Sequence, residues 1–198
     1  MNTECQIDFN KKIEELTNQY YSHNKKNVFF KSSQKMDCAA QVTNKIGIDE
    51  LIQKTIYLIP NTNSVYLDYT VFKTYATPEN YQKIVGYILS LFDHCIENYE
   101  YYDAYVNLDT FTISAAERYK SIINLFLNTC MTSECQYSIK LRNMYICNTP
   151  NTFQNISNVL MPFIDQTVKQ KILLSDKKHS VELLNNLLSK KGGVRGEP

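Results

Sequence analysis

The chain has 198 residues, 43% of them hydrophobic and 12% aromatic, which is enough for one sizeable core and short for two. Its 21 basic and 20 acidic side chains leave a net charge of +1, so no global field would attract a nucleic acid or a membrane surface. These figures predict one domain and disfavour a nucleic-acid partner.

Six cysteines are spread along the chain without a CxxC pair or the ligand spacing of a zinc site. The polar amino terminus carries no hydrophobic signal sequence, and no uncharged apolar run approaches the roughly 18 residues that a membrane span needs. We therefore expect a cytoplasmic protein with reduced thiols, no metal and no cofactor, whose association with a membrane, if any, is peripheral.

Residues 1–45 predict a helical or mobile segment ahead of the main domain. A weak helical stripe of apolar residues over 7–21 is typical of a surface helix. Residues 23–45 are polar and contain few apolar side chains, and we interpret them as a linker or mobile arm.

The apolar pattern tightens from residue 46. Two alternating apolar runs, 55–59 and 65–69, flank turn-forming residues and predict an antiparallel hairpin. Thr77 and Pro78 then predict the start of a long helix, since they match the preferred first residues of helices. Its core-facing stripe consists of Tyr81, Ile84, Val85, Ile88, Leu89, Phe92 and Ile96.

A further strand and helix follow. Residues 102–108 predict the strand, and Ser114 with Glu117 has the spacing of a capping box at the start of the helix. Strands that alternate with helices in this way predict an α/β fold with crossover connections.

The stretch from 140 to 174 predicts a strand, a helix and another strand. Residues 140–147 are short and apolar, as in a buried strand, and residues 171–174 predict the second strand. Between them, Thr149 and Pro150 predict the cap and first residue of a helix over 151–164. An apolar stripe runs along one face of this helix.

The same stretch resembles the closing part of the Sec14-like lipid-binding domains, also called CRAL-TRIO domains. The family pattern is a strand ending in N-x-P, then a helix ending in P-F-I/L-D, then V-x-x-K-I. Here it falls on Asn148, Pro150, Phe153, Pro162, Phe163, Ile164, Asp165, Val168, Lys171 and Ile172. The helix around Leu183 and the pair Gly192 and Gly193 resemble the end of that domain, although the proline usual before the glycines is missing.

The resemblance implies an α/β domain of the Sec14-like (CRAL-TRIO) type: a mixed, mostly parallel sheet with flanking helices and a lid helix. We expect this domain to occupy residues 46–193, with a tail at 194–198. In the family, the helix that corresponds to 151–164 covers an apolar cavity over the sheet. The ligand-binding residues that this implies on the lid and in the cavity are Phe153, Ile156, Val159, Leu160 and Phe163.

Periodicity alone cannot distinguish a cavity lining from an ordinary core, because both need an apolar helix face. Direct packing of the lid on the strands therefore stays open as the alternative. If the cavity exists, we expect a volume of at least ~300 Å³, as in other ligand sites.

Four basic residues, Lys140, Arg142, Lys169 and Lys171, form the candidate headgroup site. Lys171 matches the basic residue that approaches the lipid phosphate in phosphoinositide-binding members, and Lys169 matches a second basic position in the tocopherol-transfer branch. Ile139 replaces the acidic residue usual before the Lys140 strand, which argues against recognition of inositol phosphates. A solvated charge cluster is the alternative interpretation.

No catalytic motif is present: the chain lacks G-x-S-x-G, G-x-x-x-x-G-K, G-x-G-x-x-G and H-E-x-x-H, so we expect no enzyme. The resemblance instead implies non-enzymatic binding of a lipid or small hydrophobic ligand, and its transfer through transient contact with a membrane surface. The alternative is a protein-interaction module of the same fold, with a protein partner, of the type that regulates small GTPases.

Overall fold

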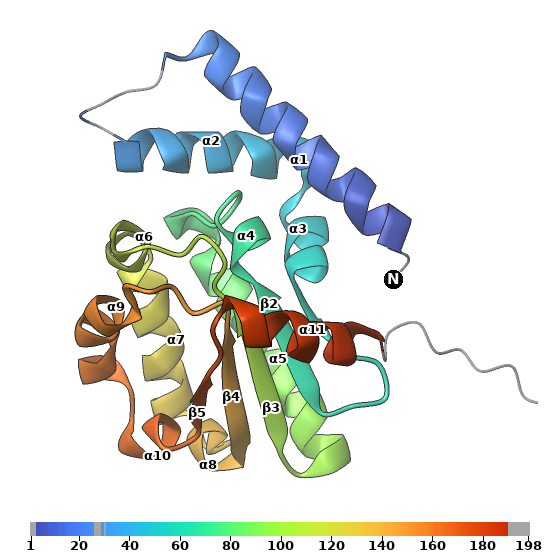
Figure 1. Cartoon of the computed structure of the whole chain (residues 1–198), viewed down its shortest axis with the longest axis vertical. Helices are drawn as coiled ribbons and strands as arrows, with labels where there is room; N and C mark the ends of the chain where they lie inside the picture. Colours follow the sequence, from blue (N-terminus) through green and yellow to red (C-terminus); the bar gives the residue numbers. More distant parts are fainter. Residues whose placement is uncertain (1–2, 26–28, 30, 190–198) are drawn as a thin grey trace, which may run out of the picture.

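The computed structural model describes residues 3–25, 29 and 31–189 (Figure 1). A five-stranded sheet forms the centre, and its strand order β1-β2-β3-β4-β5 follows the chain. The strands are β1 (Ile56–Leu58), β2 (Ser64–Asp68), β3 (Tyr102–Asn107), β4 (Leu141–Cys147) and β5 (Ile172–Leu174). β1 and β2 pair antiparallel and the other neighbours pair parallel, so the predicted hairpin and the mixed, mostly parallel sheet are confirmed.

Helices connect the strands and cover both faces of the sheet. The longer helices are α1 (Thr3–His23), α2 (Lys31–Ile46), α3 (Ile48–Thr55), α5 (Tyr81–Tyr99), α6 (Ile113–Arg118), α7 (Lys120–Thr132), α9 (Phe153–Leu160) and α11 (Lys177–Ser189). Single turns are α4 (Tyr69–Phe72), η1 (Pro78–Asn80), α8 (Tyr137–Lys140), η2 (Met161–Phe163) and α10 (Gln166–Lys169).

The crossover helices α5 and α7 lie on one face of the sheet, and α11 crosses the other face (Figure 1). On the α5 side, Phe92 stacks on Tyr102 with 4.0 Å between ring centroids, and Cys95 is fully buried. On the α11 side, Leu187 packs with Ile59 and Tyr66 in a smaller apolar cluster. The main core therefore lies between the sheet and the crossover helices.

Helices α1 and α2 pack together at one end of the molecule, next to α3, α4 and α6 (Figure 1). The interpretation of 23–45 as a linker or mobile arm is wrong for the part that forms α2. Cys38, Ala39 and Val42 are buried in that helix, and Thr43 Oγ1 donates to the Tyr75 carbonyl at 3.2 Å. Small side chains let α2 approach its neighbours closely, so its buried stripe carries little apolar signal.

Two predicted helix starts are also corrected. Thr112 caps α6, because its Oγ1 accepts from the Ala115 N–H at 3.2 Å, while Ser114 lies inside the helix. Thr149 does not cap α9: its Oγ1 donates to the Ile146 carbonyl at 3.0 Å, and the helix begins at Phe153. The predicted 151–164 helix is therefore shorter and ends in the η2 turn.

A candidate ligand cavity

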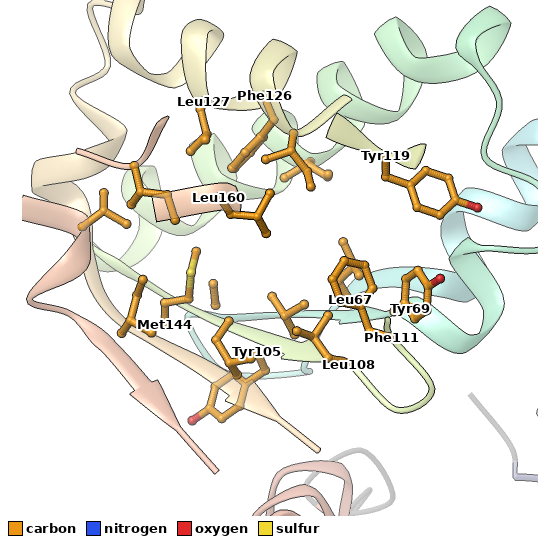
Figure 2. Close-up of a pocket in the computed structure, with 18 of the residues that line it drawn as sticks. Leu67, Tyr69, Tyr105, Leu108, Phe111, Tyr119, Phe126, Leu127, Met144 and Leu160 are labelled. Atoms are coloured by element: carbon orange, nitrogen blue, oxygen red, sulfur yellow. The ribbon is translucent and has the colours of Figure 1, made fainter. Parts of the chain in front are cut away.

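An apolar cavity of about 270 Å³ lies between the sheet and the helices α4, α5, α7 and α9 (Figure 2). Alternate residues of neighbouring strands point to the same face, so one set of side chains forms its floor. The floor residues are Val65, Leu67, Ala104, Val106, Met144, Ile146 and Ile172. The volume is slightly below the ~300 Å³ expected from other ligand sites.

The cavity extends along the strand direction. At the amino ends of β4 and β5 it is bounded by Val168 and Ile172. At the carboxyl ends of β2 and β3 it is bounded by Tyr69, Phe111 and Tyr119, which lie opposite Met144 in Figure 2. Tyr69 packs edge-on against both neighbours, with centroid distances of 4.7 Å to Phe111 and 6.1 Å to Tyr119.

Helix α9 contributes three of the predicted lid residues to the lining. Phe153, Ile156 and Leu160 all line the cavity, and Ile156 is fully buried. Phe163 lies away from the lining: 36% of it is exposed, and Lys120 Nζ lies 5.4 Å from its ring centroid. The side chain of Val159, and the residues Gly192 and Gly193, fall outside what the structure describes.

Two polar side chains of the lining form hydrogen bonds with the backbone. Tyr119 Oη donates to the Lys73 carbonyl at 3.3 Å, and Ser157 Oγ donates to the Gln154 carbonyl of its own helix at 2.8 Å. Burial raises the pKa of Tyr119, so this ring stays neutral at ordinary pH. The inner surface is thus almost entirely hydrocarbon, which favours an apolar occupant over water.

Much of the lining lies outside the residues selected from the sequence. Tyr69 belongs to the single turn α4, Phe111 to a loop, and Tyr119 to the break between α6 and α7. Helix α7 adds Phe126 and Leu127. The apolar stripes of these helices are visible in the sequence, but the stripes alone do not reveal that a void separates them from the sheet.

The four candidate headgroup residues fall into two groups. Lys140 ends α8 and Lys169 ends α10, and these two turns pack against each other at the amino ends of β4 and β5. Lys171 follows α10, and its Nζ donates to the carbonyls of Ser138 at 2.8 Å and Ile139 at 3.1 Å. Burial lowers the pKa of Lys171. Its ammonium group therefore caps the carboxyl-terminal end of α8.

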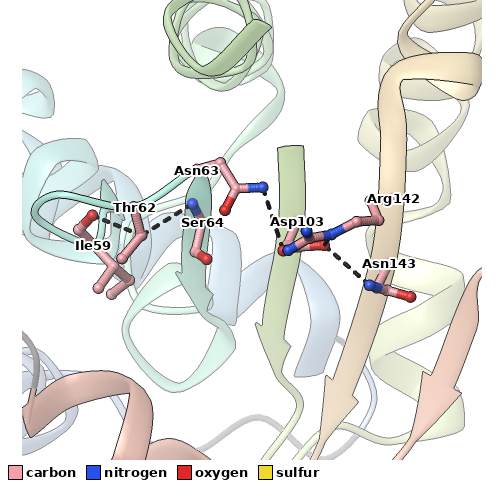
Figure 3. Close-up of polar contacts among 7 residues, drawn as sticks. All are labelled: Ile59, Thr62, Asn63, Ser64, Asp103, Arg142 and Asn143. Atoms are coloured by element: carbon pink, nitrogen blue, oxygen red, sulfur yellow. Dashed lines mark hydrogen bonds and ion pairs between the residues drawn. The ribbon is translucent and has the colours of Figure 1, made fainter. Parts of the chain in front are cut away.

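Arg142 forms a separate network on β4 (Figure 3). Its Nε donates to Asp103 Oδ1 at 3.0 Å, and its Nη2 forms an ion pair with Asp103 Oδ2. The same carboxylate accepts from Asn143 Nδ2 at 3.2 Å and Asn63 Nδ2 at 3.3 Å. The Asp103 side chain is 4% exposed, so Arg142 neutralises a buried charge. Its guanidinium also lies 4.4 Å from the Tyr101 ring centroid.

Other kinds of site were not found in the described part of the chain. No cluster of three or more His, Cys, Asp or Glu side chains there is arranged to hold a metal ion. Within residues 3–25, 29 and 31–189, no helix has the length and apolar character needed to cross a membrane.

A mixed, mostly parallel sheet with a hydrocarbon-lined cavity, and with a helix from the last strand connection beside that cavity, defines an α/β protein with room for a small apolar molecule. The family model described as CRAL/TRIO domain matches residues 64–191, and the chain belongs to this family. Members of the family generally bind lipids or other small hydrophobic ligands. No curated protein matches the chain significantly. The predicted domain boundaries at 46 and 193 stay predictions.

Proposed function

We propose that this protein binds one lipid or similarly apolar small molecule in the cavity and transfers it without chemical change. The observation that carries the proposal is the lining: a void of about 270 Å³ surrounded by hydrocarbon, with α9 across it. An apolar occupant of this void would gain dispersion contacts with the lining. A protein-interaction module does not require such a void, and we therefore favour ligand binding.

Transfer requires the ligand to leave a membrane and enter the cavity. Any apolar surface of the ligand that met water on the way would cost about 25 cal/mol per Å², so the cavity must cover this surface as the ligand leaves the membrane. The natural opening is α9, which is held to the core through Ile156 while Gln154 and Asn155 on its outer side are exposed. A transient contact with the membrane surface, with α9 displaced, would complete the exchange.

The predicted anionic headgroup site at the amino ends of the strands now depends on Lys140 and Lys169. Arg142 and Lys171 have internal partners, whereas Lys140 and Lys169 have no ion pair among the described residues. Ile139 stands where the family usually has an acidic residue. Without that residue, we expect Lys140 and Lys169 to discriminate little among anionic lipids. Liposome flotation should give similar binding to phosphatidylserine and to singly phosphorylated phosphoinositides, and strong discrimination among inositol isomers would contradict this site.

Native mass spectrometry of the purified full chain, followed by lipid extraction, tests the main proposal. We expect a population of protein carrying one apolar molecule, which is released on extraction. The Ala104→Phe variant serves as the blocked control, because a phenyl ring at this floor position fills much of the void. If the wild type carries no apolar molecule and takes up none from added lipid, the proposal is wrong.

A further inference from the structure

A cluster of cations lies outside the tyrosine end of the cavity. It consists of Lys31 and Lys35 in the first turns of α2, Lys73 directly after α4, and Arg118 at the end of α6. Two contacts bring these segments together: Arg118 Nε donates to Ser32 Oγ at 3.2 Å, and Tyr119 Oη donates to the Lys73 carbonyl at 3.3 Å. Burial and the charges of Arg118, Lys73 and Lys31 lower the pKa of Lys35.

These four cations have no ion-pair partner within the described residues. Lys73 Nζ donates to Thr110 Oγ1 at 2.7 Å, and the nearest acidic groups that act on it are Asp109 and Asp68. Asp68 Oδ1 accepts from the backbone N–H of Thr70 at 2.8 Å, and this carboxylate adds one negative charge against the four cations. Asp109 forms an ion pair with Lys177 at 3.7 Å. The cluster therefore keeps an excess of positive charge.

The position of the cluster on α2 adds to this excess. The first turn of α2 contains no acidic residue, and the free N–H groups of a helix start carry partial positive charge. Lysines at this end of a helix are unfavourable for the folded state in the absence of an anion. An anion would be attracted by both the side chains and the helix start.

Two of the cations contact the rings that bound the cavity. Lys73 Nζ lies 5.8 Å from the Tyr69 centroid, and Arg118 Cζ lies 5.8 Å from the Tyr119 centroid. Figure 2 shows both tyrosines at the same end of the cavity. Tyr69 and Tyr119 are in edge-on contact, so a molecule with its hydrocarbon part in the cavity would reach these cations when one of the two rings turns aside.

We propose that Lys35, Lys73 and Arg118 bind the anionic group, a carboxylate or a phosphate, of the ligand whose hydrocarbon part fills the cavity. This inference rests on the function proposed above and places the anion at the carboxyl ends of the strands, opposite Lys140 and Lys169. An apolar void of roughly 150 Å³ holds benzene, so about 270 Å³ holds a chain of about ten carbons. The ligand class is therefore a single-chain amphiphile.

Isothermal titration calorimetry with decanoate and 1-decanol tests the proposal, because the two probes differ mainly in charge. The wild type should bind decanoate about tenfold more tightly than decanol, as charge-assisted hydrogen bonds allow. The Lys35→Gln/Arg118→Gln variant should lose this difference and bind decanol as the wild type does. Lys45→Gln, at the other end of the same helix, is the matched control and should keep the difference.

The outcomes separate the two proposals. Equal affinities for decanoate and decanol in the wild type would overturn the anion site and leave the cavity intact. Binding of neither probe would overturn the cavity function as well. If inorganic phosphate alone binds to the cluster as tightly as decanoate, the site serves a free anion, and the assignment to an amphiphile is wrong. Unfolding midpoints of the variants within the range of the Lys45→Gln control exclude a loss of fold.

Discussion

Replacing Ala104 with phenylalanine tests whether the void is available to new atoms. Ala104 lies on β3, is 5% exposed and lines the cavity floor. The added phenyl ring needs roughly the 150 Å³ that benzene occupies in an empty protein cavity, which fits within the 270 Å³ present. Burial of an aromatic side chain contributes about 1.5–3 kcal/mol, and residual crowding offsets part of it. We expect the free energy of unfolding to rise by about 1 kcal/mol.

The matched control is Ala116→Phe. Ala116 on α6 is also buried but does not line the cavity, so the same ring has no space there. Overpacking should lower the free energy of unfolding by about 1–3 kcal/mol or more. Urea denaturation followed by circular dichroism measures both variants, and ligand uptake should be lost only in Ala104→Phe. If Ala104→Phe is destabilised as much as Ala116→Phe, the void is not available and the reasoning fails.

Three further predictions concern polar contacts, and urea denaturation checks each. Arg142→Ala should lower the free energy of unfolding by about 3 kcal/mol, because it leaves the buried Asp103 carboxylate without its counter-charge. Asp103→Ala should lower it by about 1–2 kcal/mol, since the half-exposed Arg142 can turn to water. A larger loss for Asp103→Ala than for Arg142→Ala would contradict this. Lys171→Ala should cost about 1–2 kcal/mol through its two carbonyl contacts, and a change below about 0.5 kcal/mol would show that they are not made in solution. Thr112→Ala should lower the free energy of unfolding by about 1 kcal/mol, because it removes the cap of α6, and Ser114→Ala should lower it by less than about 0.5 kcal/mol. Equal losses would favour Ser114 as a capping residue, as the sequence predicts.

The sequence predicts the sheet well because its signals are local. Alternating apolar residues and turn chemistry identify the β1–β2 hairpin, and short apolar runs identify β3, β4 and β5. Helix α2 is not predicted, because its buried face is made of Cys38, Ala39 and Val42, which are small and flanked by polar residues. Such a face packs well through close approach, but it gives a weak periodic pattern.

The candidate site is predicted less completely for two physical reasons. An apolar stripe shows only that one face of a helix avoids water, and this holds for a face in a packed core as well as for one that lines a void. The stripe therefore predicts that Phe153 and Leu160 face inward, but not that a cavity lies beside them. The partners of the basic residues are distant in sequence: Asp103 lies 39 positions before Arg142. No local sequence pattern shows that Arg142 neutralises a buried carboxylate or that Lys171 caps the carboxyl-terminal end of α8.

The parallel pairing of β4 and β5 constrains how the cavity can be opened. Two adjacent parallel strands require a connection that returns from the carboxyl end of one to the amino end of the other. That connection is the segment 148–171, which contains α9, so the lid is part of the chain path of the sheet. Both ends of the segment are fixed by strand hydrogen bonds. The lid can therefore move outward only while both of its ends stay attached to the sheet. Deleting it would disconnect β5 from β4 and would not simply open the cavity.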